Sequence, residues 1–284
     1  MSTTDPPCAI AVVVLSMGPR PTLVGAVRSL VAQDERAEIV VVHSGPGDPS
    51  ELLRAAGLDV TLVLSERPLL PGGARNAGIA ASSAPIVAFL ADDCEALPGW
   101  VRLRRENHEA GRDAVASALV SHRPNRPIAL AAHLSLFVNR LPKAQPRFAQ
   151  RYGVSYRRSL LDRVGPFRDD LRAGEDTDVN SRVGDEAAIH WDPRIQTAHH
   201  GSERLGQFLS DQAQRGRRMV ETRIALRDGL ANRVVGDAIV RTGRTLRRSV
   251  GAVERRQLPI LALAAPLVAI GGVAYAYGAA RARP

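Results

Sequence analysis

The 284-residue sequence has only two cysteines, Cys8 and Cys94, and a single lysine, Lys143. Two cysteines cannot form a disulfide framework or a cysteine-rich metal site, so we expect a reducing compartment. One lysine leaves little room for chemistry that uses a lysine nucleophile. Aromatic residues make up only 4% of the chain, and the arginines cluster beside an apolar tail, which argues against direct binding of nucleic acid.

The chain also lacks a basic stretch ahead of its first apolar run, at residues 9–15. This pattern predicts a first strand and not a signal peptide. Hydrophobic residues make up 45% of the sequence, which is enough for a substantial core. The net charge of +9, nearly all from arginine, favours an anionic partner such as a nucleotide or a membrane surface.

The first 64 residues alternate between apolar strands and amphipathic helices. Strands are predicted at residues 9–15, 39–42 and 60–64, with helices at 21–33 and 51–56 between them. A βαβαβ start of this kind is typical of a parallel, doubly wound sheet that binds a nucleotide. Such sheets hold their ligands beyond the carboxyl ends of the strands.

Two adjacent carboxylates, Asp92 and Asp93, follow a short apolar run at residues 86–90 that predicts a buried parallel strand. Mg²⁺ and Mn²⁺ prefer oxygen ligands and are typically held by one or two carboxylates together with substrate phosphates. The pair is therefore a candidate cation site. The alternative is an Asp-Asp turn or a helix cap with no ligand.

A glycine-rich helix start, PGGARNAG, precedes that strand. Gly72 and Gly73 would let the backbone approach a ligand, and Arg75 near the helix N-terminus could hold a phosphate. The alternative is a helix that packs closely on the sheet through its alanines.

The middle of the chain is less regular. We expect a helix at residues 101–110, a strand at 114–120, and a helix or a strand at 128–138. A strand at 154–156 and a helix at 158–164 then lead to GEDTD, where Glu175, Asp176 and Asp178 open another helix. Ordinary stabilisation of a helix N-terminus explains one acid, but not a cluster of three.

The C-terminal part combines a basic helix with an apolar tail. One apolar stripe recurs at helical spacing and is formed by Val235, Ile239, Thr242, Leu246, Val250 and Val253. The arginines lie on the other side: Arg233, Arg241, Arg244, Arg247, Arg248 and Arg255. This pattern favours a helix on an anionic membrane surface, with a helix docked on its own domain as the alternative. Residues 258–280 carry no charge and are long enough to span a bilayer or to lie in its interface.

Six segments in order resemble the family 2 glycosyltransferases, over residues 8–215. The segments are LSMGPRPTLVGAVRSLVAQ, IVVVHSG, PGGARNAGIAAS, IVAFLADDCEALPGW, YGVSYRRSLLDRVGPFRDDL and GEDTD. The resemblance implies a GT-A fold with a mostly parallel central sheet flanked by helices. It also implies a nucleotide-diphosphate sugar donor, a Mg²⁺ or Mn²⁺ cofactor, and inversion at the anomeric carbon.

The resemblance assigns roles to several residues. Asp93, Asp92 and His199 would hold the metal, with His200 as the alternative histidine, and Asp176 would be the catalytic base. Binding of the donor or acceptor falls on a wider set: Gly73, Arg75, Asn76, Asp92, Glu175, Arg215 and Arg218. A solvated arginine-rich helix is the alternative for the last two residues.

Two positions depart from the family pattern. Ala91 occupies a place where many members have a first aspartate, which weakens the metal site. His43 stands where members commonly have an aspartate that contacts the donor base, and we interpret it as a polar turn residue. The sequence therefore does not identify the donor base.

The sequence as a whole predicts three consecutive parts. They are a GT-A domain at residues 1–225, a basic amphipathic helical segment at 226–256, and a membrane-associating tail at 257–284. We expect an inverting sugar transferase at the cytoplasmic face of the cell membrane, acting on a cell-envelope glycan or a lipid-linked acceptor. A nucleotidyltransferase and a non-catalytic membrane-associated nucleotide-sugar-binding protein are the alternatives.

Overall fold

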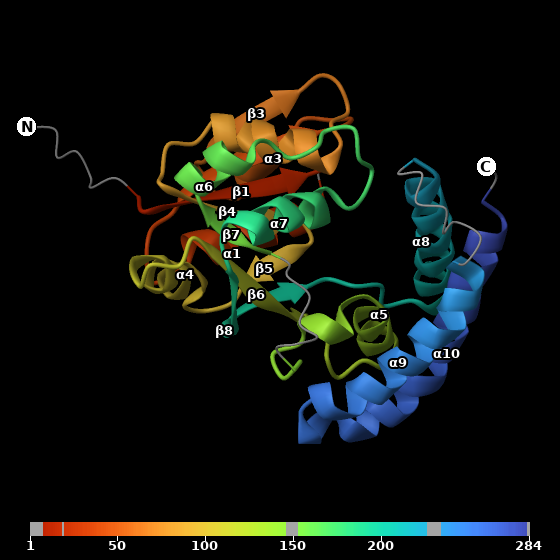
Figure 1. Cartoon of the computed structure of the whole chain (residues 1–284). Helices are drawn as coiled ribbons and strands as arrows, with labels where there is room; N and C mark the ends of the chain where they lie inside the picture. The colour runs from red at the N-terminus through yellow and green to blue at the C-terminus, as the bar shows by residue number, and fades with distance from the viewer. Residues whose placement is uncertain (1–7, 19, 146–152, 226–233, 283–284) are drawn as a thin grey trace, which may run out of the picture. The chain divides into compact units, whose positions relative to one another are not determined.

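The computed structural model describes residues 8–18, 20–145, 153–225 and 234–282. It contains an eight-stranded sheet with the strand order β3-β2-β1-β4-β7-β6-β8-β5 (Figure 1). In chain order the strands are β1 (Ile10–Ser16), β2 (Glu38–Ser44), β3 (Thr61–Ser65), β4 (Ile86–Ala91), β5 (Cys94–Ala96), β6 (Ala114–Ser121), β7 (Ser155–Arg157) and β8 (Ile189–His199). The predicted α/β class with a mostly parallel sheet is confirmed.

The first four long strands pair in parallel, with β1 between β2 and β4. Val13 lies opposite Val40 of β2 and Phe89 of β4, and every residue of β1 from Ile10 to Val14 is fully buried. Continuous apolar runs are expected where helices cover both faces of a parallel sheet. The short strand β7 runs antiparallel between β4 and β6.

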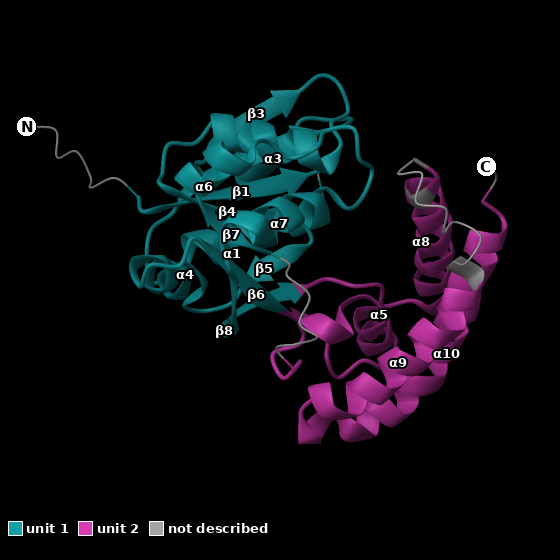
Figure 2. Ribbon diagram, viewed as in Figure 1, with its two compact units in different colours: residues 1–118, 151–198 teal, residues 119–150, 199–284 magenta. Residues whose placement is uncertain are grey.

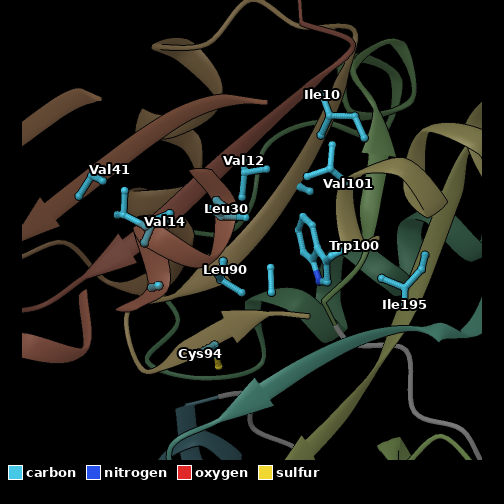
Figure 3. Packing of buried hydrophobic residues seen from close by; sticks show 14 of the residues in the cluster. Ile10, Val12, Val14, Leu30, Val41, Leu90, Cys94, Trp100, Val101 and Ile195 are labelled. Carbon is cyan, nitrogen blue, oxygen red and sulfur yellow. The ribbon is translucent and has the colours of Figure 1, made fainter. Parts of the chain in front are cut away.

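Alternate residues of β1 point to two separate hydrophobic clusters. Ile10, Val12 and Val14 pack with α1, α2 and α4 on one face, and Figure 3 shows Trp100 and Leu30 in this cluster. Val13 packs with α3, α6 and α7 on the other face. The helices are α1 (Pro21–Val31), α2 (Ser50–Ala55), α3 (Pro71–Ala80), α4 (Trp100–Glu109), α6 (Arg158–Val164) and α7 (Glu175–Glu186). This two-sided cover is the arrangement that the sequence pattern predicts.

The chain forms two compact units (Figure 2). Unit 1 comprises residues 1–118 and 151–198, and unit 2 comprises residues 119–150 and 199–284. Unit 2 is helical and contains α5 (Pro127–Phe137), η1 (Val138–Arg140), α8 (Leu205–Ala225), α9 (Val234–Ala252), η3 (Arg255–Gln257) and α10 (Leu258–Ala280). The ambiguous segment at 128–138 is therefore a helix.

Helix α10 packs against α8 and α9 through glycines. A Cβ atom on Gly278 would lie 1.8 Å from the Ala213 carbonyl oxygen of α8, and one on Gly272 would lie 2.2 Å from Thr242 Oγ1 of α9. Gly216 of α8 makes an equally close approach to the backbone of Tyr275. Small residues let helix backbones come close together, as they do in membrane helix bundles.

Only some residues of the apolar stripe predicted for α9 are buried. Ile239 and Val250 are 78% and 63% exposed, whereas Val253 is buried. The buried face of α9 consists of small or hydroxyl-bearing residues instead: Ala238, Thr245, Ser249 and Ala252. Close approach to the glycine-rich α10 selects small side chains, which explains why Ile239 and Val250 do not face that helix. The contact of the exposed stripe residues with a membrane stays a prediction. Arg233, which belonged to the predicted basic face, lies outside the described residues.

Among the described residues, one helix, Arg255–Ala280, is long and apolar enough to cross a membrane, and the mean hydropathy of its most apolar window is 2.0. Its most apolar window is 28% buried inside the structure. One face of α10, including Leu261, Ala264 and Val268, packs within unit 2. The opposite face exposes Leu263, Ile270 and Val273.

Gly78 sets the distance between α3 and the sheet, so we expect Gly78→Ala to destabilise the protein. A Cβ atom there would lie 2.2 Å from Val13 Cγ1. Overpacking of this kind costs about 1–3 kcal/mol. The measurement is the free energy of unfolding in urea. Gly184 of α7 has open space around its Cβ position, so Gly184→Ala serves as the control and should gain up to about 1 kcal/mol of helix propensity. Equal effects of the two substitutions would contradict the packing role of Gly78.

Candidate functional site

The carboxyl ends of β1, β2 and β4 meet at one edge of the sheet. The register places Ser16 of β1 beside His43 of β2, and Leu15 beside Ala91 of β4. Asp92 follows Ala91 directly and therefore lies next to the end of β1. In parallel α/β sheets this edge is the usual ligand site.

Asp92 is joined to the end of β1 by two backbone hydrogen bonds. Its Oδ2 accepts from the Met17 N–H at 3.2 Å, and its own N–H donates to the Leu15 carbonyl at 3.0 Å. The residue is 7% exposed. Burial raises the pKa of the Asp92 carboxyl, and the neighbouring Asp93 adds to the rise, whereas the Met17 hydrogen bond opposes it. A cation beside this carboxylate would offset the free-energy cost of its charge.

Asp93 is half-buried and follows Asp92 without an intervening residue. The Cys94 thiol donates to Asp93 Oδ1 at 3.4 Å. Burial, with a contribution from the Asp93 charge, raises the pKa of the Cys94 thiol well above its usual value. This cysteine therefore stays protonated and acts as a donor to the carboxylate. The two carboxylates fit the oxygen preference of Mg²⁺ or Mn²⁺.

His43 is not the turn residue that we predicted. The second strand continues through Ser44, because His43 pairs with Ser16 on one side and Leu64 on the other. The His43 ring is 1% exposed, and its Nδ1 lies 3.2 Å from Ser16 Oγ. Its buried Nε2 has no hydrogen-bond partner among the described residues.

Arg75 and Glu175 form a buried ion pair between α3 and α7. The two residues are 9% and 6% exposed. The Arg75 guanidinium also lies 5.4 Å from the ring centroids of Phe89 and of Phe167. Both residues were predicted to contact substrate, and the structure brings them together across 100 positions of sequence. The pair therefore fixes the start of α7 against α3.

The small residues at the start of α3 make close contacts within the protein. A Cβ atom on Gly72 would lie 1.9 Å from the Arg168 carbonyl oxygen. A Cβ atom on Gly73 would lie 3.5 Å from its nearest neighbour, the Cβ atom of Asp169. Asn76 donates to the Phe167 carbonyl at 2.8 Å and accepts from the Phe167 N–H at 3.0 Å. The closest described contacts of Gly72, Gly73 and Asn76 are with the segment 167–169 and not with the sheet, so they do not decide between the two alternatives. The roles of Gly73, Arg75 and Asn76 toward a substrate stay predictions.

Asp176 lies in the first turn of α7, next to the Arg75–Glu175 pair. Gly174 precedes the helix in the left-handed region, with φ of 91°. Asp176 is half-buried, and its Oδ1 accepts from the Thr177 N–H at 2.8 Å. Burial raises the pKa of Tyr156, and the charge of Asp176 contributes to the rise. Asp178, in the same turn, is paired with Arg182 at 2.7 Å.

The other predicted site residues belong to unit 2. The His199 ring lies 5.0 Å from the Phe137 ring and 6.2 Å from the His133 ring, centroid to centroid. The His200 ring stacks on His122 at 3.8 Å. The metal-binding role of His199 stays a prediction.

The two predicted arginines of α8 differ in their surroundings. Burial lowers the pKa of Arg215 to about 9, and the positive charge of Arg241 contributes. Arg218 is exposed. Their assignment to the donor diphosphate stays a prediction.

Sequence reasoning missed the residues that support the site from neighbouring strands. Met17 anchors Asp92, Ser16 contacts His43, and the Ser44 hydroxyl accepts from the Leu69 N–H. The available signal was position: Ser16 and Ser44 each lie within two residues of the end of a predicted strand. A search for acidic, basic and histidine residues alone could not reveal these supporting residues.

Comparison with known proteins gives a family and a fold. The family described as "Glycosyl transferase family 2" matches residues 11–165, which is more than half of the chain. The pre-mycofactocin glycosyltransferase of Mycobacterium tuberculosis is 27% identical over 198 residues, covering 66% of this chain and 42% of that protein. The succinoglycan biosynthesis protein ExoU of Rhizobium meliloti is 28% identical over 201 residues, covering 64% of this chain and 58% of that protein. The chain thus spans about half the length of these relatives.

Two solved structures support the GT-A fold. The mannosyltransferase PcManGT from Pyrobaculum calidifontis, in complex with GDP-Man and Mn²⁺, aligns with a TM-score of 0.60 and 18% identity. The alignment covers 96% of this chain and 86% of that one. S. aureus TarS, residues 1–349, aligns with a TM-score of 0.53 and 15% identity, covering 96% of this chain and 91% of that one.

We expect Asp92→Asn to raise the melting temperature of the metal-free protein at neutral pH. Asparagine keeps an acceptor for the Met17 N–H but removes a charge that burial disfavours. The stabilisation should shrink as the pH falls from neutrality toward about 4, the usual aspartate value, because the wild-type carboxyl then becomes neutral as well. The measurement is thermal unfolding in EDTA across this pH range.

Asp48→Asn is a control with the opposite sign. Hydrogen bonds from the Ser50 hydroxyl and N–H lower the pKa of Asp48, so its charged form is favoured in the fold. Removing that charge should lower the melting temperature at neutral pH. A lower melting temperature for Asp92→Asn at pH 8 would contradict the assigned cost of the buried charge.

Proposed function

Because the chain belongs to glycosyl transferase family 2, we propose that it transfers a sugar from a nucleotide-diphosphate sugar to an acceptor hydroxyl, with inversion at the anomeric carbon. The observation that carries the proposal is the carboxylate of Asp92, buried and anchored to the Met17 N–H at the carboxyl edge of the parallel strands. The GDP-Man and Mn²⁺ of the Pyrobaculum mannosyltransferase support a nucleotide-sugar donor and a divalent cation for this fold.

Asp92 and Asp93 are the residues that would hold the cation. Two adjacent oxygen donors, one of them with a pKa raised by burial, suit a divalent ion that keeps several waters. Ala91 supplies no third carboxylate, so the donor phosphates would complete the ligand set. When bound, the ion stabilises the negative charge of the departing diphosphate as a Lewis acid.

Asp176 is the proposed general base. Inversion requires one carboxylate that takes the proton of the acceptor hydroxyl as that oxygen attacks the anomeric carbon. The electron pair of the bond to the diphosphate leaves with the diphosphate. Asp176 is half-buried and so remains accessible, whereas its neighbour Glu175 is held by Arg75 and acts as a positioning residue. The Arg75–Glu175 pair keeps the first turn of α7 in place for this proton transfer.

His43 is the proposed residue that distinguishes donors. Its Nε2 is buried and without a hydrogen-bond partner among the described residues, at the carboxyl end of β2. An unsatisfied buried polar atom costs about 1–3 kcal/mol. A donor group that hydrogen bonds to Nε2 would recover this free energy, and the neutral imidazole can serve either as donor or as acceptor.

The exposed apolar face of α10 supports attachment to a membrane surface. Leu263, Ile270, Val273 and Tyr277 are 59%, 47%, 70% and 55% exposed, and no charged residue interrupts residues 258–280. Because the other face packs on α5, α8 and α9, the helix suits an interfacial position at the cytoplasmic leaflet. Attachment there, together with a relative named for succinoglycan biosynthesis, favours a lipid-linked or cell-envelope glycan as acceptor.

We expect Asp176→Asn to lower the rate of sugar transfer by roughly 100- to 10,000-fold, the range for loss of a general base. The measurement is transfer from labelled nucleotide sugars in membranes supplied with Mn²⁺. Asp185→Asn, at an exposed position of the same helix, should leave the rate unchanged. Undiminished transfer by Asp176→Asn would refute the assigned base.

We expect Asp93→Asn to abolish the metal-dependent part of nucleotide binding. In the wild type, a nucleoside diphosphate with Mn²⁺ at about 100 times its Kd should raise the free energy of unfolding by about 2.7 kcal/mol. This corresponds to a rise of about 5–10 °C in melting temperature. The measurement is thermal unfolding with a panel of nucleoside diphosphates, with and without Mn²⁺. Asp59→Asn, at the amino end of β3, should respond like the wild type. Full retention of the Mn²⁺ effect in Asp93→Asn would exclude this residue as a ligand.

A further inference from the structure

A cavity of about 440 Å³ lies in unit 2, between the segment that follows η1 and the last turns of α9. Lys143, Arg247 and Arg248 line it, together with the amides of Asn139 and Gln145. No aspartate or glutamate belongs to its described lining. The cavity therefore concentrates positive charge, and it contains the only lysine of the chain.

Two of the positive charges that line this cavity have no acidic partner among the described residues. Neither Lys143 nor Arg247 forms an ion pair within the described part of the chain. The nearest acid along the sequence, Glu254, lies 2.5 Å from Arg256 and is engaged there. Three like charges around one cavity repel one another, so an anion bound between them would be stabilised.

The donor set suits a phosphate group. Arg248 Nη1 donates to Asn139 Oδ1 at 2.7 Å, which orients the guanidinium on the cavity wall. An arginine fork matches phosphate oxygens geometrically, and a lysine ammonium adds a mobile point charge. Lys143 and Arg247 are exposed, so a ligand can reach the cavity from solvent or from a membrane surface.

The surroundings of the cavity favour a phosphate carried by a lipid. Val250, three residues after Arg247 on α9, is 63% exposed. Arg255 and Arg256 follow on η3, and the exposed apolar face of α10 begins at Leu258, which is 42% exposed. Cationic and exposed apolar residues that follow one another along one helical hairpin are typical of elements that bind anionic membranes.

We propose that this cavity binds the phosphate group of an anionic membrane lipid and so fixes the α9–α10 hairpin on the membrane. The inference rests on the membrane attachment proposed above, but not on sugar transfer. It assigns a ligand class to residues outside the candidate catalytic site, and it gives the exposed apolar face of α10 a defined anchoring point.

The test compares two double variants of the full chain. Lys143→Gln with Arg247→Gln removes two charges from the cavity. Arg204→Gln with Arg244→Gln removes two charges from exposed positions of unit 2 that do not line it. Binding is measured by flotation with vesicles of phosphatidylcholine alone, or with 20 mol% phosphatidic acid, at about 0.15 M salt to limit long-range attraction.

The wild type should bind the phosphatidic acid vesicles at least tenfold more tightly than the neutral ones. The affinity of the cavity variant for the phosphatidic acid vesicles should fall at least fivefold. The affinity of the control variant should fall less than twofold. Equal losses in the two variants would overturn the proposal, because general surface charge would then explain the binding. The melting temperature is also compared in 10 mM inorganic phosphate and with the phosphatidic acid vesicles. An equal rise in the two would overturn the lipid as the source of the phosphate group.

A third measurement separates this proposal from the proposed function. The cavity variant should keep the wild-type melting-temperature rise with Mn²⁺ and nucleoside diphosphates, because Lys143 and Arg247 lie outside that site. Lost vesicle binding with an intact nucleotide response supports the lipid site. A cavity variant that loses the nucleotide response as well would overturn it, since the two residues would then act on the fold or on the donor.

Discussion

The hydrogen bond from the Met17 N–H to Asp92 joins the ends of β1 and β4, and the candidate site depends on it. It is possible only because β1 and β4 run parallel and in a register that sets Leu15 beside Ala91. The same register carries Ser16 and His43 to this edge from β1 and β2. Two hydrophobic clusters, one on each face of β1, hold the strands in that register. The chemistry of a few polar side chains is thus fixed by the pairing of apolar ones.

Much of the fold could be predicted because its signals are local. The apolar runs of β1, β2 and β4, and the uncharged run that became α10, are visible at their own positions. Contacts between distant segments were not predictable in this way. Nothing near Arg75 indicates that its guanidinium meets Glu175, and His43 looked like a turn residue because its pairing with Ser16 lies outside its own segment. The carboxylates at the strand end were recognisable, but the residues that anchor them were not.

The two compact units are held together internally by different packing. In unit 1, branched and aromatic side chains fill both faces of the sheet. In unit 2, glycines at 216, 272 and 278 bring α8, α9 and α10 close together, which leaves larger apolar residues such as Ile239 and Val273 on the outside. Larger apolar residues of the same unit, including Leu130, Phe208 and Leu261, form a separate buried cluster. The sequence pattern of α9 shows its apolar stripe, but it does not show that small residues such as Ala238 and Ser249 make the buried contacts of the helix.

The position of β7 affects how the chain folds during synthesis. This strand pairs with both β4 and β6, yet it is made after them. At about 5–20 residues per second, the ribosome takes several seconds to make the segment between β4 and Ser155. During that time β4, with its apolar sequence, has an unpaired edge of the kind that joins other chains. Strand order therefore sets the interval over which this edge of β4 waits for its partner.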